Sequence, residues 1–214
     1  MSSTHSSHPS SNDTARHAVV RKLVTERAGR EWCLFLDRDG VINRQIVGDY
    51  VREWRDFEWL PLARRALKVL REWAPHLVVV TNQQGIGKGL MSAEAVTAIH
   101  DGVRAELATE GVVLDAILVC HHLKSAGCEC RKPRPGLVKA WLEEHPRVDR
   151  SLSVMVGDSQ SDLELAHQVA VESGECASVL IGGLNIQTVV PDASFKSLWD
   201  FAVAVDRVLL EQRP

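Results

Sequence analysis

The stretch LFLDRDGVIN at residues 34–43 places two carboxylates, Asp37 and Asp39, directly after a short apolar run. The segment WCLFLD (32–37) has the length and composition of a buried β-strand. Asp37 would end this strand, and Asp39 would lie one residue further on, where a bending loop lets the two side chains point in different directions. Because like charges repel, the pair indicates a metal ion, a reaction or plain exposure on a loop.

Similar apolar runs recur along the chain and alternate with segments of helical spacing. Five runs are expected as strands: 32–37, 76–82, 114–120, 152–158 and 177–183. Five segments are expected as helices: 60–73, Ser92 to about Gly111, 137–142, the stretch after Asp158 with Ser161 and Glu164 at capping-box spacing, and Phe195 to Leu209. This alternation predicts an α/β fold, a Rossmann-like three-layer sandwich with a mainly parallel sheet.

Polar residues follow three of the expected strands, as DRDG, TNQQG and GDSQSD. The carboxyl ends of parallel strands meet at the edge where such sheets bind ligands. Asp37, Asp39 and Asp158 would supply oxygen ligands suited to Mg²⁺. Thr81 and the glycine-rich NQQGIGKG would suit a phosphate, and Lys132 would add positive charge. Together they predict phosphoryl-transfer chemistry.

Each part of this pattern has a simpler explanation when taken alone. A D-x-D after a strand is often an exposed turn, and Asp158 or Asp162 could merely favour a helix N-terminus. Thr81 could satisfy a strand end, and Lys132 could be solvated. The joint occurrence, after successive strands in this order, favours the functional interpretation.

The chain has five cysteines, an odd number that argues against a disulfide framework when no secretory signal precedes it. A cytoplasmic protein is therefore expected. The segment CHHLKSAGCECRKP has the spacing of a closed structural Zn²⁺ site, with the ligands Cys120, His122, Cys128 and Cys130. His121 could replace its neighbour His122, and the alternative to a metal site is a set of reduced, unliganded thiols.

Length and charge limit the other possibilities. The 214 residues, 45% of them hydrophobic, suit one domain, which we place at 31–214 with a zinc loop at 120–132. Residues 1–30 are polar and expected to be disordered or loosely attached. The formal net charge of -3 gives no reason to expect nucleic acid, and no apolar run is long enough to span a membrane. A monomer or weak dimer is expected.

Four motifs, DRDGVIN, TNQQGIGKG, CRKPRPG and VGDSQSDLELA, resemble in type and order those of the haloacid dehalogenase superfamily of phosphatases. The resemblance covers most of the chain. It implies that Asp37 attacks phosphorus and forms an aspartyl-phosphate. Asp39 would protonate the leaving oxygen and then activate water, while Thr81 and Lys132 hold the phosphoryl oxygens. Mg²⁺ would be held by the Asp37 carboxylate, the Asp39 main-chain carbonyl and Asp158.

The cysteine segment narrows the resemblance to one subfamily, and this favours His122 as the fourth zinc ligand. The subfamily contains the heptose bisphosphate phosphatases and the phosphatase half of a bifunctional histidine-biosynthesis enzyme. GDYV and FEWLP are similar to the heptose enzymes, whereas the short loop before Cys128 is closer to the histidinol phosphatase pattern. His121 stands where a proline usually follows the first cysteine. The stretch from Gly40 to Thr81 leaves no room for a large cap domain.

The substrate is therefore expected to be a small phosphorylated metabolite recognised by loops, and Arg131 could take a second phosphate or a sugar hydroxyl. A heptose 1,7-bisphosphate cleaved at C7 is favoured, and histidinol phosphate is the alternative. A catalytically silent zinc-loop protein that binds a sugar phosphate or a partner is the alternative from another class; a phosphomutase is disfavoured by the missing cap. The expected substrate-binding residues are Arg38, Val47, Gly48, Asp49, Tyr50, Asn82, Gln83, Gln84 and Arg131.

Overall fold

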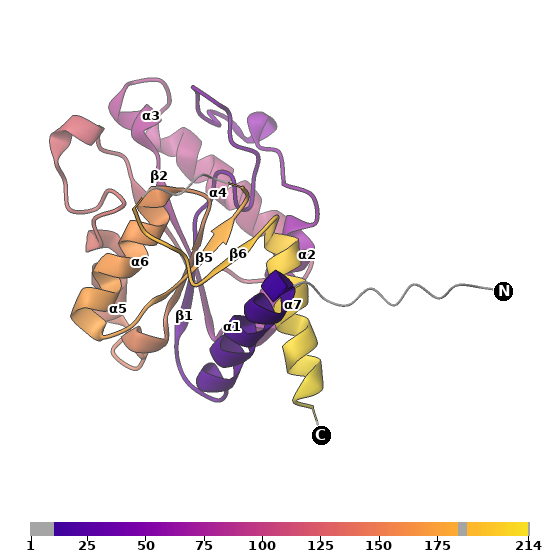
Figure 1. Ribbon diagram of the computed structural model, residues 1–214. Helices are drawn as coiled ribbons and strands as arrows, with labels where there is room; N and C mark the ends of the chain where they lie inside the picture. The colour runs from indigo at the N-terminus through magenta and orange to yellow at the C-terminus, as the bar shows by residue number, and fades with distance from the viewer. Residues whose placement is uncertain (1–10, 184–187, 214) are drawn as a thin grey trace.

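The computed structural model describes residues 11–183 and 188–213, with the backbone alone for residues 11, 12, 172 and 173 (Figure 1). Within these ranges the chain forms a parallel six-stranded sheet of order β3-β2-β1-β4-β5-β6, covered by helices on both faces. The predicted Rossmann-like three-layer α/β fold is confirmed. The strands are β1 Cys33–Leu36, β2 His76–Asn82, β3 Ala116–Cys120, β4 Val154–Gly157, β5 Ala177–Ile181 and β6 Ala193–Phe195.

The connecting segments hold seven α-helices and three short 3₁₀ turns in the described part of the chain. The helices are α1 Ser11–Arg27, α2 Ala63–Trp73, α3 Gln84–Gly87, α4 Ala93–Ala108, α5 Gly136–Glu144, α6 Gln160–Ser173 and α7 Leu198–Glu211. The turns are η1 Trp54–Asp56, η2 Lys124–Ala126 and η3 Arg150–Leu152. The segment between β1 and β2 contains a loop, η1 and α2, which agrees with the prediction that no large cap domain is inserted there.

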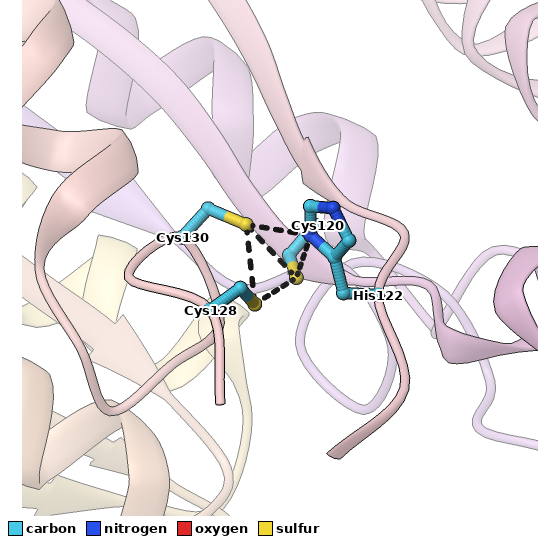
Figure 2. Close-up of side chains that lie close together, drawn as sticks. All are labelled: Cys120, His122, Cys128 and Cys130. Atoms are coloured by element: carbon cyan, nitrogen blue, oxygen red, sulfur yellow. Dashed lines mark hydrogen bonds between the residues drawn. The ribbon is translucent and has the colours of Figure 1, made fainter. Parts of the chain in front are cut away.

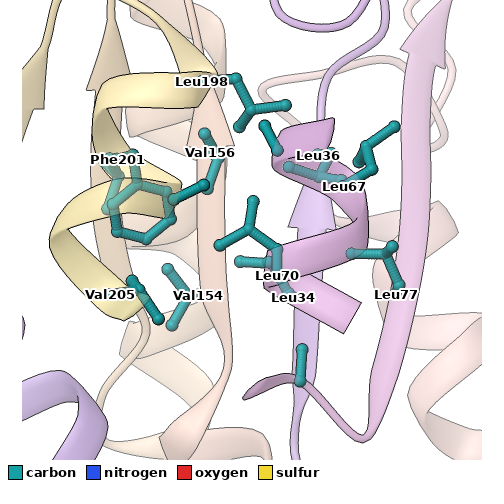
Figure 3. Close-up of a cluster of buried hydrophobic side chains, with 14 of the residues drawn as sticks. Leu34, Leu36, Leu67, Leu70, Leu77, Val154, Val156, Leu198, Phe201 and Val205 are labelled. Atoms are coloured by element: carbon teal, nitrogen blue, oxygen red, sulfur yellow. The ribbon is translucent and has the colours of Figure 1, made fainter. Parts of the chain in front are cut away.

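The core lies in two layers because successive strand residues face opposite sides of the sheet. Leu34 and Leu36 face α2 and α7, together with Val154 and Val156 from the neighbouring strand (Figure 3). Helices α1 and α4 add to the same layer. Cys33 and Phe35 face the other side, where α5 and α6 cover them. With both faces buried, the strands are continuous apolar runs, and this is why the sequence pattern predicted them.

The N-terminal region differs from expectation. Residues 11–27 form α1, which packs beside α7 and near β6, as Figure 1 shows. Val20, Leu23 and Val24 are buried in this contact. Their spacing is that of one helix face, and the polar residues around them masked it in the sequence. The expectation of a disordered or loosely attached segment is wrong for Ser11–Arg27, and residues 1–10 lie outside the described part.

Three other element assignments are corrected. The first predicted helix begins at Ala63, after Leu62 in a left-handed conformation with φ 61°. Phe195 belongs to β6, which was not predicted, and α7 starts after Ser197, whose hydroxyl accepts from the Asp200 N–H. The capping box of α6 is formed by Ser159 and Asp162 and not by Ser161 and Glu164, because Ser159 has the extended backbone of an N-cap. In the described ranges, no helix is long and apolar enough to cross a membrane.

Candidate active site

The centre of the sheet has a switch point between β1 and β4. From β1 the chain builds outward to β2 and β3, and from β4 it builds in the opposite direction to β5 and β6. Asp37 follows β1 and Asp158 follows β4, so both stand at the crevice where such sheets bind ligands. A cavity of about 270 Å³ opens there. Its lining is Asp37, Asp39, Gln45, Ile46, Asp49, Tyr50, Val51, Thr81, Asn82, Arg131, Lys132, Asp158, Ser159 and Ser161.

Lys132 joins two carboxylates beneath this cavity. Its Nζ lies 2.7 Å from Asp37 Oδ1 and 2.7 Å from Asp162 Oδ1, and it donates to the Val80 carbonyl at 2.8 Å. Burial alone would lower the pKa of Lys132, but the carboxylates of Asp162 and Asp37 outweigh it and raise that pKa. The lysine is therefore a fixed positive charge. Asp162 was considered in the sequence only as a helix N-terminal residue, and its contact with Lys132 depends on the fold.

The backbone of the Lys132 segment is tied to the end of β2. The Lys132 N–H donates to Asn82 Oδ1 at 3.1 Å, and Asn82 Nδ2 donates to the Lys132 carbonyl at 3.2 Å. This reciprocal pair satisfies both main-chain groups of one residue with a single side chain. Asn82 was predicted to bind substrate, and it lines the cavity while also holding the lysine in place.

Asp37, Asp158 and Asp162 bring carboxylate oxygens within 4.8 Å of one another. Burial, with the charges of Asp162 and Asp158, raises the pKa of Asp37 to about 8 even though Lys132 opposes it. Burial and Asp162 likewise raise the pKa of Asp158 to about 6. A divalent cation would relieve this repulsion, and the all-oxygen donor set suits Mg²⁺. The backbone of Gly40 packs closely against Asp158, because a methyl group on Gly40 would lie 1.9 Å from Asp158 Oδ2.

Asp39 is held by three side chains. Arg38 Nη2 donates to both of its carboxylate oxygens at 2.9 and 3.0 Å, Asn43 Nδ2 donates at 2.9 Å, and Gln83 Nε2 donates at 2.8 Å. Burial would raise the pKa of Asp39, but the guanidinium and these hydrogen bonds lower it. The carboxyl group is therefore ionised in this arrangement, and its orientation is fixed.

Arg38, an expected substrate-binding residue, does not line the cavity. Its side chain is 1% exposed and lies away from the cavity, with Nη1 3.1 Å from His100 Nε2. Because a guanidinium can only donate, the histidine nitrogen must accept. The DRDG motif alone does not indicate this burial, because the contacting residue, His100, comes from α4.

The other expected substrate residues divide into two groups. Asp49, Tyr50, Asn82 and Arg131 line the cavity, whereas Val47, Gly48, Gln83 and Gln84 are absent from its lining. Val47 is 94% exposed, and Gln83 donates to Asp39 and to Thr81 Oγ1 at 2.8 Å each. Five residues line the cavity but were not predicted as site residues: Gln45, Ile46, Val51, Ser159 and Ser161. Val51, Ser159 and Ser161 lie inside GDYV and GDSQSD, motifs from which other residues were chosen, and Gln45 and Ile46 directly precede Val47, the first residue selected in that loop.

The four predicted zinc ligands converge in one cluster, which Figure 2 shows. The S···S distances are 3.3 Å from Cys120 to Cys130, 3.4 Å from Cys128 to Cys130 and 3.7 Å from Cys120 to Cys128. His122 Nδ1 lies 3.1 Å from Cys130 Sγ. A tetrahedral zinc with Zn–S bonds of about 2.3 Å places its sulfurs roughly 3.8 Å apart, so the cluster is of the right size. His122, and not His121, turns its ring nitrogen into it.

The chemistry available at the cavity follows from these contacts. Asp37 offers a carboxylate that can act as a nucleophile next to a buried lysine. Asp39 offers a second carboxyl group, which hydrogen bonds from three side chains hold in a fixed orientation. Thr81 Oγ1 accepts from Gln83, so its own proton is available to a phosphoryl oxygen. Arg131 Nη1 is buried and has no hydrogen-bond partner among the described residues. A bound anion that carries a second charged group would accept a hydrogen bond from this nitrogen.

Comparison with known proteins gave consistent matches. Residues 34–192 match the family model described as polynucleotide kinase 3 phosphatase. The chain is 64% identical over 183 residues to the D-glycero-alpha-D-manno-heptose-1,7-bisphosphate 7-phosphatase of Mycobacterium tuberculosis, which covers 86% of this chain and 96% of that protein. It is 34% identical over 182 residues to the D-glycero-beta-D-manno-heptose-1,7-bisphosphate 7-phosphatase of Pseudomonas aeruginosa, covering 83% and 97%.

Among solved structures, the chain resembles the D,D-heptose 1,7-bisphosphate phosphatase from B. bronchiseptica, described as complexed with magnesium and phosphate. The TM-score is 0.70 with 31% sequence identity, and the match covers 84% of this chain and 99% of that one.

Proposed function

From the premise that the chain belongs to the haloacid dehalogenase superfamily of phosphatases, in the family of the heptose bisphosphate phosphatases, we propose that it hydrolyses the 7-phosphate of D-glycero-D-manno-heptose 1,7-bisphosphate. The observation that carries the proposal is the convergence of Asp37, Lys132 and Asp158 at the switch point, beside Arg131, whose Nη1 has no hydrogen-bond partner among the described residues. The relative with 64% identity is named for the alpha anomer, and we propose the same preference here.

In the first step, an oxygen of Asp37 forms a bond to phosphorus while the bond from phosphorus to the sugar oxygen breaks. Asp39 gives its proton to the departing oxygen. Asp39 must be protonated for this step, and the negative charge of a bound phosphoryl group raises a neighbouring carboxyl pKa in that direction. Thr81 and Lys132 hold the phosphoryl oxygens.

In the second step, water attacks the phosphorus of the aspartyl-phosphate and Asp39 takes the proton that water loses. The bond to Asp37 breaks, inorganic phosphate leaves, and the nucleophile is restored. The hydrogen bonds from Arg38, Asn43 and Gln83 favour the ionised Asp39 that this step requires.

We propose Mg²⁺ as the resident metal, held by the Asp37 carboxylate, the Asp39 main-chain carbonyl and Asp158. When bound, it supplies positive charge that stabilises the phosphoryl oxygens and keeps the nucleophile ionised. Asp162 belongs to the same carboxylate group, but its Oδ1 lies 2.7 Å from Lys132 Nζ. We therefore assign it to positioning that lysine.

We also propose a structural Zn²⁺ at Cys120, His122, Cys128 and Cys130, with no open ligand position. Burial and the neighbouring thiols raise the pKa of Cys130 to about 12, and a bound cation would reverse this by stabilising the thiolate. Arg131 and Lys132 follow the last cysteine directly, so the metal would fix the segment that presents both. The five cysteines, all in the described part of the chain, form no disulfide, and this agrees with the cytoplasmic location that we propose. The expected monomer or weak dimer stays a prediction.

Arg131 favours the bisphosphate over histidinol phosphate, the alternative substrate. A second phosphate would satisfy its buried nitrogen with a charge-assisted hydrogen bond. Histidinol phosphate would instead bring a cationic amine toward a guanidinium. The third possibility, a silent binding protein, is disfavoured by the complete set of Asp37, Asp39, Thr81, Lys132 and Asp158.

The test is phosphate release, with and without Mg²⁺, from both anomers of the heptose bisphosphate, from histidinol phosphate and from a phosphorylated oligonucleotide. We expect the highest kcat/KM for the alpha bisphosphate. Asp37→Asn should lower turnover by several orders of magnitude, because no other carboxylate can replace the nucleophile. Arg131→Ala should raise KM for the bisphosphate and leave a generic aryl phosphate unaffected. A higher kcat/KM for histidinol phosphate would contradict the substrate assignment.

A further inference from the structure

The short helix α3, Gln84–Gly87, lies between two loops of different origin. One is the substrate loop, residues 45–51, and the other is the zinc loop, residues 120–132. A methyl group on Gly85 would lie 2.9 Å from Tyr50 Cγ, and one on Gly87 would lie 2.8 Å from the His121 carbonyl oxygen. The backbone of α3 therefore touches both loops at positions where a larger residue would force one of them to move.

The Gln84 side chain completes this bridge. Its Oε1 accepts from the Lys124 N–H of the zinc loop at 2.7 Å, and its Nε2 donates to the Tyr50 hydroxyl of the substrate loop at 3.4 Å. Two backbone bonds reinforce the zinc-loop side, from the Gln83 N–H to the Cys120 carbonyl at 2.7 Å and from the Gly87 N–H to the His121 carbonyl at 3.1 Å. Gln84 itself does not line the cavity.

Tyr50 and Arg131 form part of the same cavity wall, and they come from the two loops that α3 connects. Lys88, at the end of α3, places its Nζ 5.4 Å from the centre of the Tyr50 ring and adds a further contact. Movement of the zinc loop would therefore displace Arg131 directly and Tyr50 through α3.

We propose that Gln84 is a positioning residue that couples the zinc loop to Tyr50, so that one metal-stabilised loop sets both sides of the part of the cavity that holds the non-reacting end of the substrate. The effect on substrate selectivity rests on the proposed function. The mechanical coupling between the zinc loop and Tyr50 does not, and it is measured separately below.

The kinetic test uses Gln84→Met, which keeps the length of the side chain and removes both hydrogen bonds. KM for the heptose bisphosphate should rise about three- to tenfold, the range for loss of one neutral hydrogen bond, because of the two bonds only the one to Tyr50 holds a residue of the cavity lining. kcat should change less than twofold, and kcat/KM for an aryl phosphate should be unchanged because this substrate carries no second phosphate or sugar hydroxyl for Tyr50 to position. The matched control is Gln212→Ala, whose side chain bonds to Thr25 on the distant α1–α7 face.

A double-variant cycle shows whether Gln84 acts through the tyrosine. In a Tyr50→Phe background, Gln84→Met should change KM by less than half as much, on a logarithmic scale, as it does in the wild type. Equal effects in the two backgrounds, or a loss confined to kcat, would overturn the positioning role.

The coupling has a direct readout because Tyr50 is the single tyrosine of the chain. Protein labelled with 3-fluorotyrosine should give one ¹⁹F resonance from this site. Gly87→Ala presses on the zinc loop without removing a ligand, and we expect it to shift the resonance in zinc-loaded protein. In Gln84→Met the same substitution should shift it less than half as far. Gly183→Ala, where the surroundings are open, should leave it in place.

The two tests fail independently. A ¹⁹F shift of equal size with and without Gln84, or no shift with either, would overturn the coupling whatever the substrate is. If the resonance behaves as expected but the bisphosphate is not cleaved, the proposed function fails and the coupling stands. Zinc content measured on each variant, at about one per chain, ensures that the comparison is between metal-loaded proteins.

Discussion

His100 provides a test of the buried network behind Asp39. It lies on α4 with 7% of its surface exposed, and its Nε2 faces Arg38 Nη1 at 3.1 Å. The nitrogen must accept from the guanidinium, so the ring is neutral and carries its proton on Nδ1. Burial, followed by the charge of Arg38, lowers the pKa of His100 from 6.5 to about 3.

The sign of the stability effect follows from proton uptake. The unfolded chain binds a proton on this histidine below about pH 6.5, and the folded chain does not until about pH 3. The contribution to the free energy of unfolding is therefore complete above pH 6.5 and is lost as the pH falls toward 3. At about 1.4 kcal/mol per pH unit, lowering the pH from 7.5 to 5.0 removes about 2 kcal/mol through this one group.

The assay is urea unfolding at pH 7.5 and 5.0 for the wild type and for His100→Gln. Glutamine can still accept from Arg38 but does not titrate. Other groups with shifted pKa values, such as Asp37, contribute alike to both proteins and cancel in the difference. We expect the wild type to lose about 2 kcal/mol more than the variant between the two pH values. Equal losses would refute a neutral, buried His100.

Three further changes test other parts of the structure. Metal analysis should find about one zinc per chain in the wild type, and Cys128→Ser or Cys130→Ser should remove it and lower Tm; full zinc content in these variants would contradict the ligand assignment. Leu23→Ala should lower the free energy of unfolding by about 2–4 kcal/mol, since its side chain is 4% exposed; an effect near zero would mean that α1 does not pack. Asp162→Asn should destabilise the protein by about 3 kcal/mol because it leaves Lys132 with one carboxylate fewer, and it should also lower kcat; unchanged urea unfolding and turnover would show that Asp162 does not position the lysine.

The sequence by itself determined where five of the six described strands lie along the chain, and which polar residues follow them. Buried parallel strands are continuous apolar runs, so periodicity locates them without knowledge of their partners. Asp37 and Asp158 follow such runs directly, and the edge they share is a consequence of the parallel arrangement. The sequence also predicted the cysteine cluster, because its four residues lie within a single short loop.

Only the tertiary structure decided which polar groups face one another across the fold. Arg38 is adjacent to Asp37 in sequence, yet it turns into the protein, where its guanidinium contacts His100. Lys132 meets Asp162 beneath the cavity, and Gln84 connects Tyr50 to the zinc loop. Each of these contacts joins residues far apart in the chain, and side-chain orientation depends on what is packed on the far side. No local pattern carries that information, because it arises only when the separate elements are brought together.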